Sequence, residues 1–378
     1  MMVSLARKTL RYEWRRFLPA VLAIGFASLL LLMQAALVLG IFGSASVYIT
    51  GSSADVWVGF PGTQSVDQGR PIDSNISAMM HMDPDVVRVE PFLWLDGDWH
   101  GEGNTGGVSV YVSGIDCDPG GLMFSRALPP AMRAMLTEPD AVVVDRAELD
   151  KLGAHIGSRA YINGHRVRVV GVASGLRALG GVNVVTSMDT ARRLDDDPLH
   201  PDWPTYFVAS LRDPGLARGV AKRLDGHVGF GRYRAWSADD FARRSVVFWM
   251  FDTGAGAGVL FLAGVVFLVG AVISSQTLVA AVVGSLREYA TLNALGVGLR
   301  SLRWVVLEQA FWVGMIGVVG AIGVGASLIE LARLRDVPVV FNLQISLICV
   351  LSVLGLAAVS GLAALNSLRR ADPAVLLR

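Results

Sequence analysis

The sequence predicts a helical membrane protein with four transmembrane helices and a large α+β extracytoplasmic domain between the first and second helices. Of its 378 residues 53% are hydrophobic and only 17% are charged, too apolar a balance for an ordinary soluble protein. Four apolar stretches each exceed the roughly 20 residues that cross a bilayer. They cover residues 17–42, 253–286, 304–329 and 339–368. The mixed segment 43–245 is long enough to bury a core of its own.

The first sixteen residues are expected to form an interfacial helix on the cytoplasmic side. Leu10, Trp14 and Phe17 share one helical face, and arginines occupy the others. A cleaved signal peptide is the alternative. Its apolar region is usually only about 7–15 residues long, shorter than the run at 17–42, so we expect this first span to be retained.

Basic residues near the span ends set the expected orientation. Four arginines and one lysine precede the first span, Arg287, Arg300 and Arg303 lie between the second and third, and Arg369, Arg370 and Arg378 follow the fourth. Both termini, the segment 287–303 and the tail 369–378 are therefore expected in the cytoplasm, and the loop 330–338 outside. The protein is expected to be a multi-pass protein of the inner (plasma) membrane.

The extracytoplasmic segment shows short strand patterns separated by loops rich in glycine, proline and aspartate. Strands are predicted at 54–60, 108–114, 141–144, 160–162, 167–172 and 205–211. Asn163-Gly164 between two apolar runs predicts a type I′ hairpin. Short helices are predicted at 146–152 and 214–224, which makes the domain α+β.

Several functional classes find no support in the residues. A net charge of +1 predicts no nucleic-acid partner, and two cysteines provide no disulfide framework. The six histidines are His81, His100, His155, His165, His200 and His227. They lack metal-binding spacings, so no metal site is predicted, and no catalytic motif appears. We therefore expect a non-catalytic protein.

A nucleotide site is also not expected in this chain. A phosphate-binding Walker A loop needs G-x-x-x-x-G-K-[ST], and none of Lys8, Lys151 and Lys222 has that context. No cofactor is expected here; if ATP drives the protein, a partner chain binds the ATP and Mg²⁺.

The run REYATLNALG, residues 287–296, closely resembles the EYATLKALG segment of MacB/FtsX-type (type VII) ABC transporter permeases. The four-span layout with one large loop after the first span resembles that superfamily too. Residues 20–27, 32–34, 54–58, 269–270 and 274–277 make the chain most similar to the DevC subgroup.

The resemblance implies a homodimer of four-span subunits, each resting on a cytoplasmic ABC ATPase subunit. It implies ATP-driven movement of the extracytoplasmic domains, which would expel an amphiphilic or lipid-like substrate from outside the membrane. A periplasmic adaptor and an outer-membrane channel are further expected partners, together with membrane lipids.

The segment after the second span is the predicted site of coupling to the ATPase. Ala290, Asn293 and Ala294 share one side of a short helix, and Gly296 and Gly298 permit a tight exit. An ordinary cytoplasmic loop is the alternative. The predicted coupling residues are Arg287, Glu288, Tyr289, Ala290, Thr291, Leu292, Ala294, Leu295 and Gly296.

Other residues within and near the spans are candidates for packing or contact. Glu308 is expected either to pair with Arg303 near the interface or to face the bundle and take part in coupling. Small-residue stripes at Gly317, Ala321 and Gly325, and at Gly254 and Gly258, predict close helix packing, including at a dimer interface. The candidates for contact with a substrate or with the membrane interface are Gln34, Tyr48, Trp57, Trp249, Phe251 and Asp252. All of them except Gln34 are expected to cluster near the outer membrane surface.

Two other functions remain open at this point. An FtsX-like regulator would activate a cell-wall hydrolase through its outer domain without moving a substrate, but such domains are usually smaller than this one. A lipoprotein-release permease has a similar layout, although those systems commonly pair two different permeases.

Overall fold

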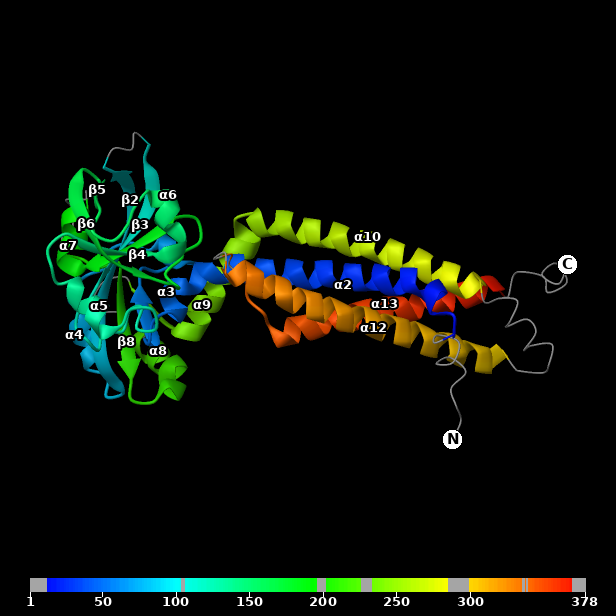
Figure 1. Cartoon of the computed structure of the whole chain (residues 1–378). Helices are drawn as coiled ribbons and strands as arrows, with labels where there is room; N and C mark the ends of the chain where they lie inside the picture. The colour runs from blue at the N-terminus through cyan, green and yellow to red at the C-terminus, as the bar shows by residue number, and fades with distance from the viewer. Residues whose placement is uncertain are drawn as a thin grey trace. The chain divides into compact units, whose positions relative to one another are not determined.

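The computed structural model describes residues 12–102, 106–195, 202–225, 233–284, 299–334, 337 and 339–368. The chain divides into two compact units (Figure 1). Residues Ile41–Gly256 form one unit, called the outer domain below. Met1–Gly40 and Ala257–Arg378 form the other, called the membrane unit.

In the part of the chain that the structure describes, four long apolar helices make up the membrane unit. They are α2 (Trp14–Gly43), α10 (Ala255–Gly284), α12 (Leu299–Leu334) and α13 (Leu343–Leu368). Among the described residues, helices at Trp14–Thr50, Gly256–Thr277 and Leu307–Ala332 are long and apolar enough to cross a membrane, and a shorter apolar stretch lies at Leu343–Gly355. The whole of α13 has 26 residues and is about 39 Å long.

The ends of the helices differ from the spans read from the sequence. Helix α12 runs beyond both ends of the predicted third span, so Arg300, Arg303 and Glu330 lie within the helix. Helix α13 begins later than the predicted fourth span, which started at 339. The Asn342 carboxamide explains that start, because its Oδ1 accepts a hydrogen bond from the Gln344 amide at 2.9 Å and caps the helix.

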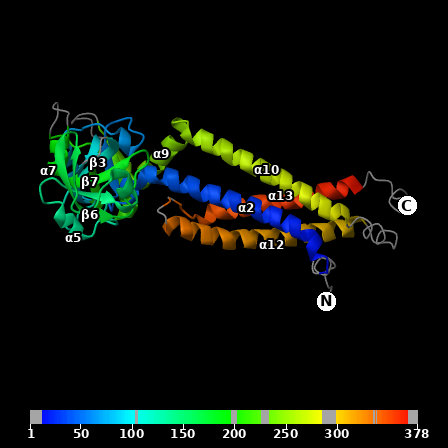
Figure 2. The ribbon, with the colours of Figure 1, turned by 45° about the horizontal axis from the view of Figure 1, so that its top comes forward.

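Within the membrane unit, α2 lies between α10 and α12 (Figure 2). Phe17, Ala20 and Ile24 of α2 form a buried cluster with Ala310 and Val313 of α12 and Val353 of α13. On the other side, a Cβ atom on Gly270 of α10 would lie 3.0 Å from the Ala27 Cβ. Small residues therefore let α2 pack closely against two neighbours.

Nine strands of the described residues form the sheet of the outer domain. They are β1 (Val56–Gly59), β2 (Val86–Gly101), β3 (Val108–Ile115), β4 (Ala141–Asp145), β5 (Arg159–Ile162), β6 (His165–Ala173), β7 (Val182–Ser187), β8 (Tyr206–Leu211) and β9 (Arg234–Ser237). The strand order is β3-β7-β4-β6-β5-β2-β8-β1-β9, and β2 also pairs with β3.

Strand β2 organises this domain because its two halves have different neighbours. From Leu93 onward it pairs with β3 and then β5, which closes the ring β2-β3-β7-β4-β6-β5. From Val86 to Phe92 it pairs with β8, which continues through β1 to β9. One long strand thus joins a closed barrel to a small open sheet.

Short helices cover the sheet and connect it to the spans. They are α3 (Val47–Thr50), α4 (Ile76–His81), α5 (Pro130–Met135), α6 (Leu149–Leu152), α7 (Met188–Leu194), α8 (Ala217–Asp225) and α9 (Ala238–Val247). Serine side chains cap the first turns of α7 and α9: Ser187 Oγ accepts from the Thr190 amide, and Ser237 Oγ from the Asp240 amide.

The structure confirms the predicted strands at β1, β3, β4, β5, β6 and β8, and the helices at 146–152 and 214–224. Asn163 and Gly164 have φ angles of 49° and 77°, the left-handed pair that a type I′ turn requires. Strands β2, β7 and β9 were not predicted from the sequence. Strand β2 could not be predicted because its apolar alternation is interrupted. The interruptions are the buried Glu90, Pro91 and the polar run Asp96–Asp98.

Candidate functional site

The predicted coupling segment lies outside the described residues. Helix α10 ends at Gly284 and α12 begins at Leu299, so Arg287 to Gly296 fall between them. The coupling assignment stays a prediction that rests on the sequence alone.

The outer domain receives the chain from the first span through a nearly unbroken helical backbone. Gly43 and Val47 both have right-handed helical torsions, and the single turn Ser44–Ser46 links α2 to α3. On α3, Tyr48 is 2% exposed and its hydroxyl accepts a hydrogen bond from Trp94 Nε1 at 3.3 Å. The connection therefore ends in the domain core.

The return to the second span passes through a different kind of connection. Helix α9 runs into a π-helical turn at Phe248–Asp252, and Gly254 then adopts a φ of +76° before α10 begins. Such π turns are rare and often lie at functional sites. Since Gly254 precedes the helix in a left-handed conformation, the predicted Gly254–Gly258 packing stripe is wrong.

Trp249 anchors this turn to a loop far away in the sequence. Its Nε1 donates to Ser65 Oγ and to Asp67 Oδ1, each at 3.2 Å, and Ser65 Oγ also donates to Asp67 Oδ1. Phe251 is 58% exposed, and Asp252 is also exposed. Of the three candidates on this turn, Trp249 is held by the domain, whereas Phe251 and Asp252 remain accessible.

Negative charge gathers on the same side of the domain. Burial, reinforced by the charge of Asp67, raises the pKa of the Asp96 carboxyl, and burial with both carboxylates raises the pKa of the Tyr111 hydroxyl. The folded chain therefore holds the Asp96 proton more tightly than the unfolded chain. Stability from this group is lost as pH rises through the folded-state pKa.

Trp57 and Tyr48 lie in the core of the outer domain rather than on an accessible surface. Trp57 is 0% exposed, and its ring centroid lies 5.6 to 5.9 Å from those of Phe92, Tyr206 and Phe241. The expectation that Tyr48 and Trp57 meet the membrane surface or a substrate is corrected by this burial. Both faces of β1 are covered, since Val56, Trp57 and Val58 are all buried, and the sequence could not show that.

Both connections to the membrane helices meet in this aromatic core. The ring centroid of Tyr48 on α3 lies 6.1 Å from that of Phe92. The ring of Phe241 on α9 stacks on that of Trp236, with 4.8 Å between their centroids. Helix α9 also packs against α3 and the Ser44–Ser46 turn. The two segments that lead to different spans are thus fastened to each other.

The stripe on α12 packs against α2 of the same chain. A Cβ on Gly317 would lie 2.9 Å from the Val21 carbonyl oxygen and 3.0 Å from the Gly25 amide nitrogen. Ala321 is 3% exposed, and a Cβ on Gly325 would lie 3.5 Å from Leu29 Cδ1. These residues therefore mark packing inside one subunit rather than a dimer interface.

Replacing Gly317 with alanine is expected to weaken the α2–α12 contact by about 1–3 kcal/mol, because the new methyl group meets backbone atoms that cannot yield. Thermal unfolding of the detergent-solubilised protein measures the loss. Gly320→Ala is the matched control, since no atom lies within 4 Å of its Cβ position. Equal stability of the two variants would contradict the close approach.

The polar candidates within the spans have varied surroundings. Gln34 of α2 and Glu308 of α12 are both half-buried. The Arg303 side chain lies outside the described part of the chain, which leaves the predicted Glu308 pair untested. Next to Glu308, Gln309 is 2% exposed, a buried polar residue that the sequence analysis missed. The polar side chain of Gln309 within an apolar run could have marked it as a candidate.

Ser65 and Asp67 were missed too, and no signal in the sequence could have indicated them. They lie at the short 3-10 turn Val66–Gln68, which has no recognisable motif, and their partner Trp249 is more than 180 residues away. Among the described residues, no three histidines, cysteines or carboxylates gather as a metal site. His200 and His227 lie outside the described residues.

A comparison of the whole chain with curated proteins found no match. Among solved structures, the chain is similar to the periplasmic region of MacB from Actinobacillus actinomycetemcomitans, with a TM-score of 0.36 and 13% identity over 52% of this chain and 94% of that one. It is also similar to the extracellular domain of the ABC-type transporter YknZ from Gram-positive bacteria, with a TM-score of 0.35 and 10% identity over 48% of this chain and 99% of that one.

Two protein families match the sequence over separate regions. The MacB-like periplasmic core domain matches residues 20–226, and the FtsX-like permease C-terminal region matches residues 260–373. Together they include the outer domain as far as α8, most of α10, and all of α12 and α13. Strand β9, α9 and the π-helical turn lie between the two matches. Because the first match alone covers more than half of the 378 residues, the protein belongs to the MacB- and FtsX-like family of ABC transporter permeases.

Proposed function

We propose that this chain is the permease subunit of an ATP-driven exporter of the DevC subgroup, which expels an amphiphilic or lipid-like substrate through movements of its outer domain. Permeases of this family pair with an ABC ATPase. The observation that carries the proposal is the shared aromatic core, in which the connections from both neighbouring spans end.

The core explains how motion would pass outward. Tyr48 and Phe241 belong to the two connecting segments, and both are buried in one cluster with Trp57, Phe92 and Tyr206. A displacement of either span would therefore move the whole cluster instead of being absorbed between the connections. The π-helical turn and Gly254 supply the bend on the side of α10.

The proposal includes partners that supply what this chain lacks. Two copies of the chain would each dock one subunit of a cytoplasmic ATPase, which binds the ATP and Mg²⁺. A periplasmic adaptor and an outer-membrane channel would receive the substrate. Both termini would lie in the cytoplasm, as the basic residues near the span ends favour.

Trp249→Phe is expected to impair coupling while the outer domain stays folded. The variant keeps an aromatic ring but loses the two hydrogen bonds to Ser65 and Asp67, and bonds to charged groups contribute about 1.5–3 kcal/mol. ATP-driven movement should fall by at least half, measured from the distance between spin labels on the outer domains of two copies. Phe248→Leu, on the same turn, is the control for loss of ring volume alone. Normal ATP-driven movement in Trp249→Phe would show that the hydrogen bonds of Trp249 to Ser65 and Asp67 are not needed for coupling.

The function itself is tested by reconstituting the chain with its ATPase in lipid vesicles. The chain alone is expected to hydrolyse no ATP, and the complex should contain two copies of it. With ATP, the complex should release membrane amphiphiles into solution, as measured by mass spectrometry; an ATPase variant that cannot hydrolyse ATP is the control. Domain movement without any release would favour an FtsX-like regulator. Release of lipoproteins alone would favour a lipoprotein-release permease.

A further inference from the structure

The outside of the barrel carries exposed side chains of both charges on three neighbouring strands. Strands β2, β5 and β6 pair side by side (Figure 1), and successive residues on each strand point alternately into the barrel and away from it. Ala160, Ile162 and Val167 point inward and are buried in its core. The exposed residues that alternate with the buried ones form what we call the barrel face. They are Asp96, Asp98, His100, Arg159, Tyr161 and Arg166.

The strand register arranges the barrel face around one central row. His100 lies opposite Tyr161, and Tyr161 lies opposite Arg166, so these three side chains cross the face side by side. Asp98 comes two residues before His100 on the same strand. The side chains of Asp98 and His100 lie together, because a Cβ on Gly107 would be 3.4 Å from both Asp98 Oδ1 and His100 Nε2. Backbone pairing therefore fixes where these residues lie on the face.

The charges on the barrel face fall into two groups on opposite sides of that row. The acidic group, Asp96 and Asp98, lies on β2 before the row. Strand β5 runs antiparallel to β2, so Arg159 at its start lies on the other side. Arg159 and Arg166 form the basic group. With strands about 4.8 Å apart and alternate residues about 7 Å apart, the centres of the two groups are separated by roughly 15 Å.

The basic group has no acidic partner of its own. In the described ranges, no ion pair or side-chain hydrogen bond involves Arg159 or Arg166. Arg159 lies directly opposite Arg168, and like charges in that position destabilise a sheet. Arg168 is compensated by an ion pair with Glu138, whereas Arg159 is not. A carboxylate from another molecule would relieve this repulsion.

The acidic group lacks a cation in the same way. No arginine or lysine among the residues that the structure describes forms an ion pair with Asp96 or Asp98. Burial, reinforced by the charge of Asp67, raises the pKa of the Asp96 carboxyl. Asp96 and Asp98 line a shallow groove of about 430 Å³, together with Ser109 and Asn163. The groove offers room beside both carboxylates for a side chain from another molecule.

We propose that the barrel face is the surface at which the outer domains of two copies of this chain meet, the basic group of each against the acidic group of the other. The inference rests on the proposed pairing of two copies and assigns the contact between their outer domains. A two-fold contact uses the same patch on both subunits, which must therefore be complementary to itself. Two groups of opposite charge on either side of one row meet that condition and place Tyr161 near the axis.

The mixed charge favours a second copy over a partner of a single charge. An acidic protein surface that approached the basic group would also meet Asp96 and Asp98, which repel it. In a pair of copies, both groups gain a partner. Exposed ion pairs are individually weak, but two copies held on one pair of ATPase subunits would meet at a high effective concentration.

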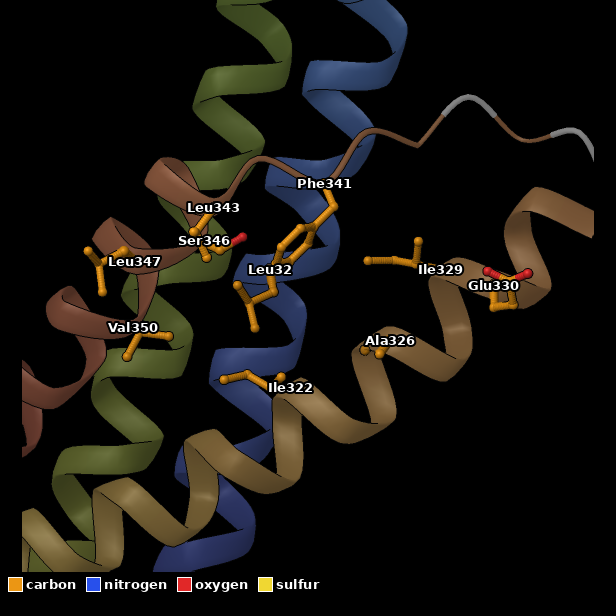
Figure 3. Close-up of a pocket in the computed structure, with 11 residues that line it drawn as sticks. Leu32, Ile322, Ala326, Ile329, Glu330, Phe341, Leu343, Ser346, Leu347 and Val350 are labelled. Atoms are coloured by element: carbon orange, nitrogen blue, oxygen red, sulfur yellow. The ribbon is translucent and has the colours of Figure 1, made fainter.

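The apolar groove of the membrane unit differs from the barrel face in this respect. Leu32 of α2, Ile322 of α12 and Leu347 of α13 line it, and Ser346 and Glu330 are the only polar side chains among the described residues of its lining (Figure 3). Lipid or any apolar helix fits such a surface, whereas the barrel face requires a pattern of charges.

Cross-linking of the full chain, reconstituted with its ATPase in lipid nanodiscs, tests the contact. Cys117 and Cys349 are first replaced by serine, so that a cysteine introduced at Tyr161 is the one target in this chain for a short bis-maleimide. Tyr161→Cys should yield a covalent dimer in most of the complex. Met82→Cys is the matched control, because Met82 is 83% exposed and lies outside the barrel face. Equal cross-linking at both positions would indicate random collision and overturn the proposal.

Charge exchange makes the test specific. In the Tyr161→Cys chain, Arg166→Glu and Asp98→Arg should each lower cross-linking about fivefold, because each sets like charges against each other across the two copies. Combined in one chain, they exchange the charges and should restore most of the yield. Arg212→Glu, an exposed position just after β8, is the matched control and should change nothing. Unchanged cross-linking in both single variants, or no recovery in the combined one, would refute the contact.

The outcomes separate this inference from the proposed function. Cross-linking needs no substrate, so it reports the contact alone. A complex that contains two copies and releases amphiphiles, but does not cross-link at Tyr161→Cys, would refute only this surface. Charge-dependent cross-linking without any release would leave the surface standing and count against export. A complex with a single copy of this chain would overturn both.

Discussion

The double variant Arg287→Glu/Ala290→Trp is expected to lose both export and substrate-stimulated ATP hydrolysis. In the predicted short helix, Ala290 would be buried in a groove of the ATPase, and a tryptophan there would introduce an overpacking strain of roughly 1–3 kcal/mol. That strain alone would weaken docking by about 5- to 140-fold. Arg287→Glu adds repulsion against an acidic partner surface, although the neighbouring Glu288 moderates this contribution.

The measurement is ATPase activity and amphiphile release by the reconstituted complex, side by side. Membrane abundance of the variant is the control for folding and should be unchanged, because neither residue lies within a predicted span. A doubly substituted chain that exports at the normal rate would show that residues 287–296 form an ordinary loop. The coupling assignment would then have to be withdrawn.

Trp57→Ala is expected to destabilise the outer domain by about 3–5 kcal/mol, the usual loss when a buried tryptophan is truncated. The cavity would open between the rings of Phe92, Tyr206 and Phe241. For a domain of this size, the midpoint of thermal unfolding should fall by roughly 6–20 °C. Export should fall too, since the two connections lose their common support.

Two variants show whether the loss comes from packing. Trp57→Phe should be milder, because it keeps a ring and removes a buried Nε1 that has no hydrogen-bond partner among the described residues. Met82→Ala should change stability by no more than about 0.5 kcal/mol, since Met82 is 83% exposed. If Trp57→Ala unfolded like the unmodified protein but failed to export, Trp57 would act on the substrate after all.

The secondary structure was predictable wherever one local cause decides it. Uninterrupted apolar runs indicated the long helices, and Asn163-Gly164 indicated the hairpin because few other pairs tolerate two left-handed residues. Strand β2 was not predictable by that route. Its first half faces β8 and its second half faces β3 and β5, so no single pattern of burial runs along it.

The candidate functional residues also fall into those that a local motif indicates and those that a contact between distant segments brings together. The motif at 287–296 identified a family through adjacent residues, and the family matches at 20–226 and 260–373 agree with that identification. The anchor of Trp249 on Ser65 and Asp67 joins residues more than 180 positions apart. Residue type alone cannot indicate such a pair.

The sequence by itself determined that this is a membrane permease with a large outer domain, because hydrophobic length and a local motif are properties of contiguous residues. Only the tertiary structure decided which surfaces are covered. It placed Trp57 and Tyr48 in the core instead of at the membrane surface, and it assigned Gly317 to contact with Gly25 in the same chain. Burial depends on which distant segments pack together, and the amphipathic pattern of one segment cannot show what lies against it.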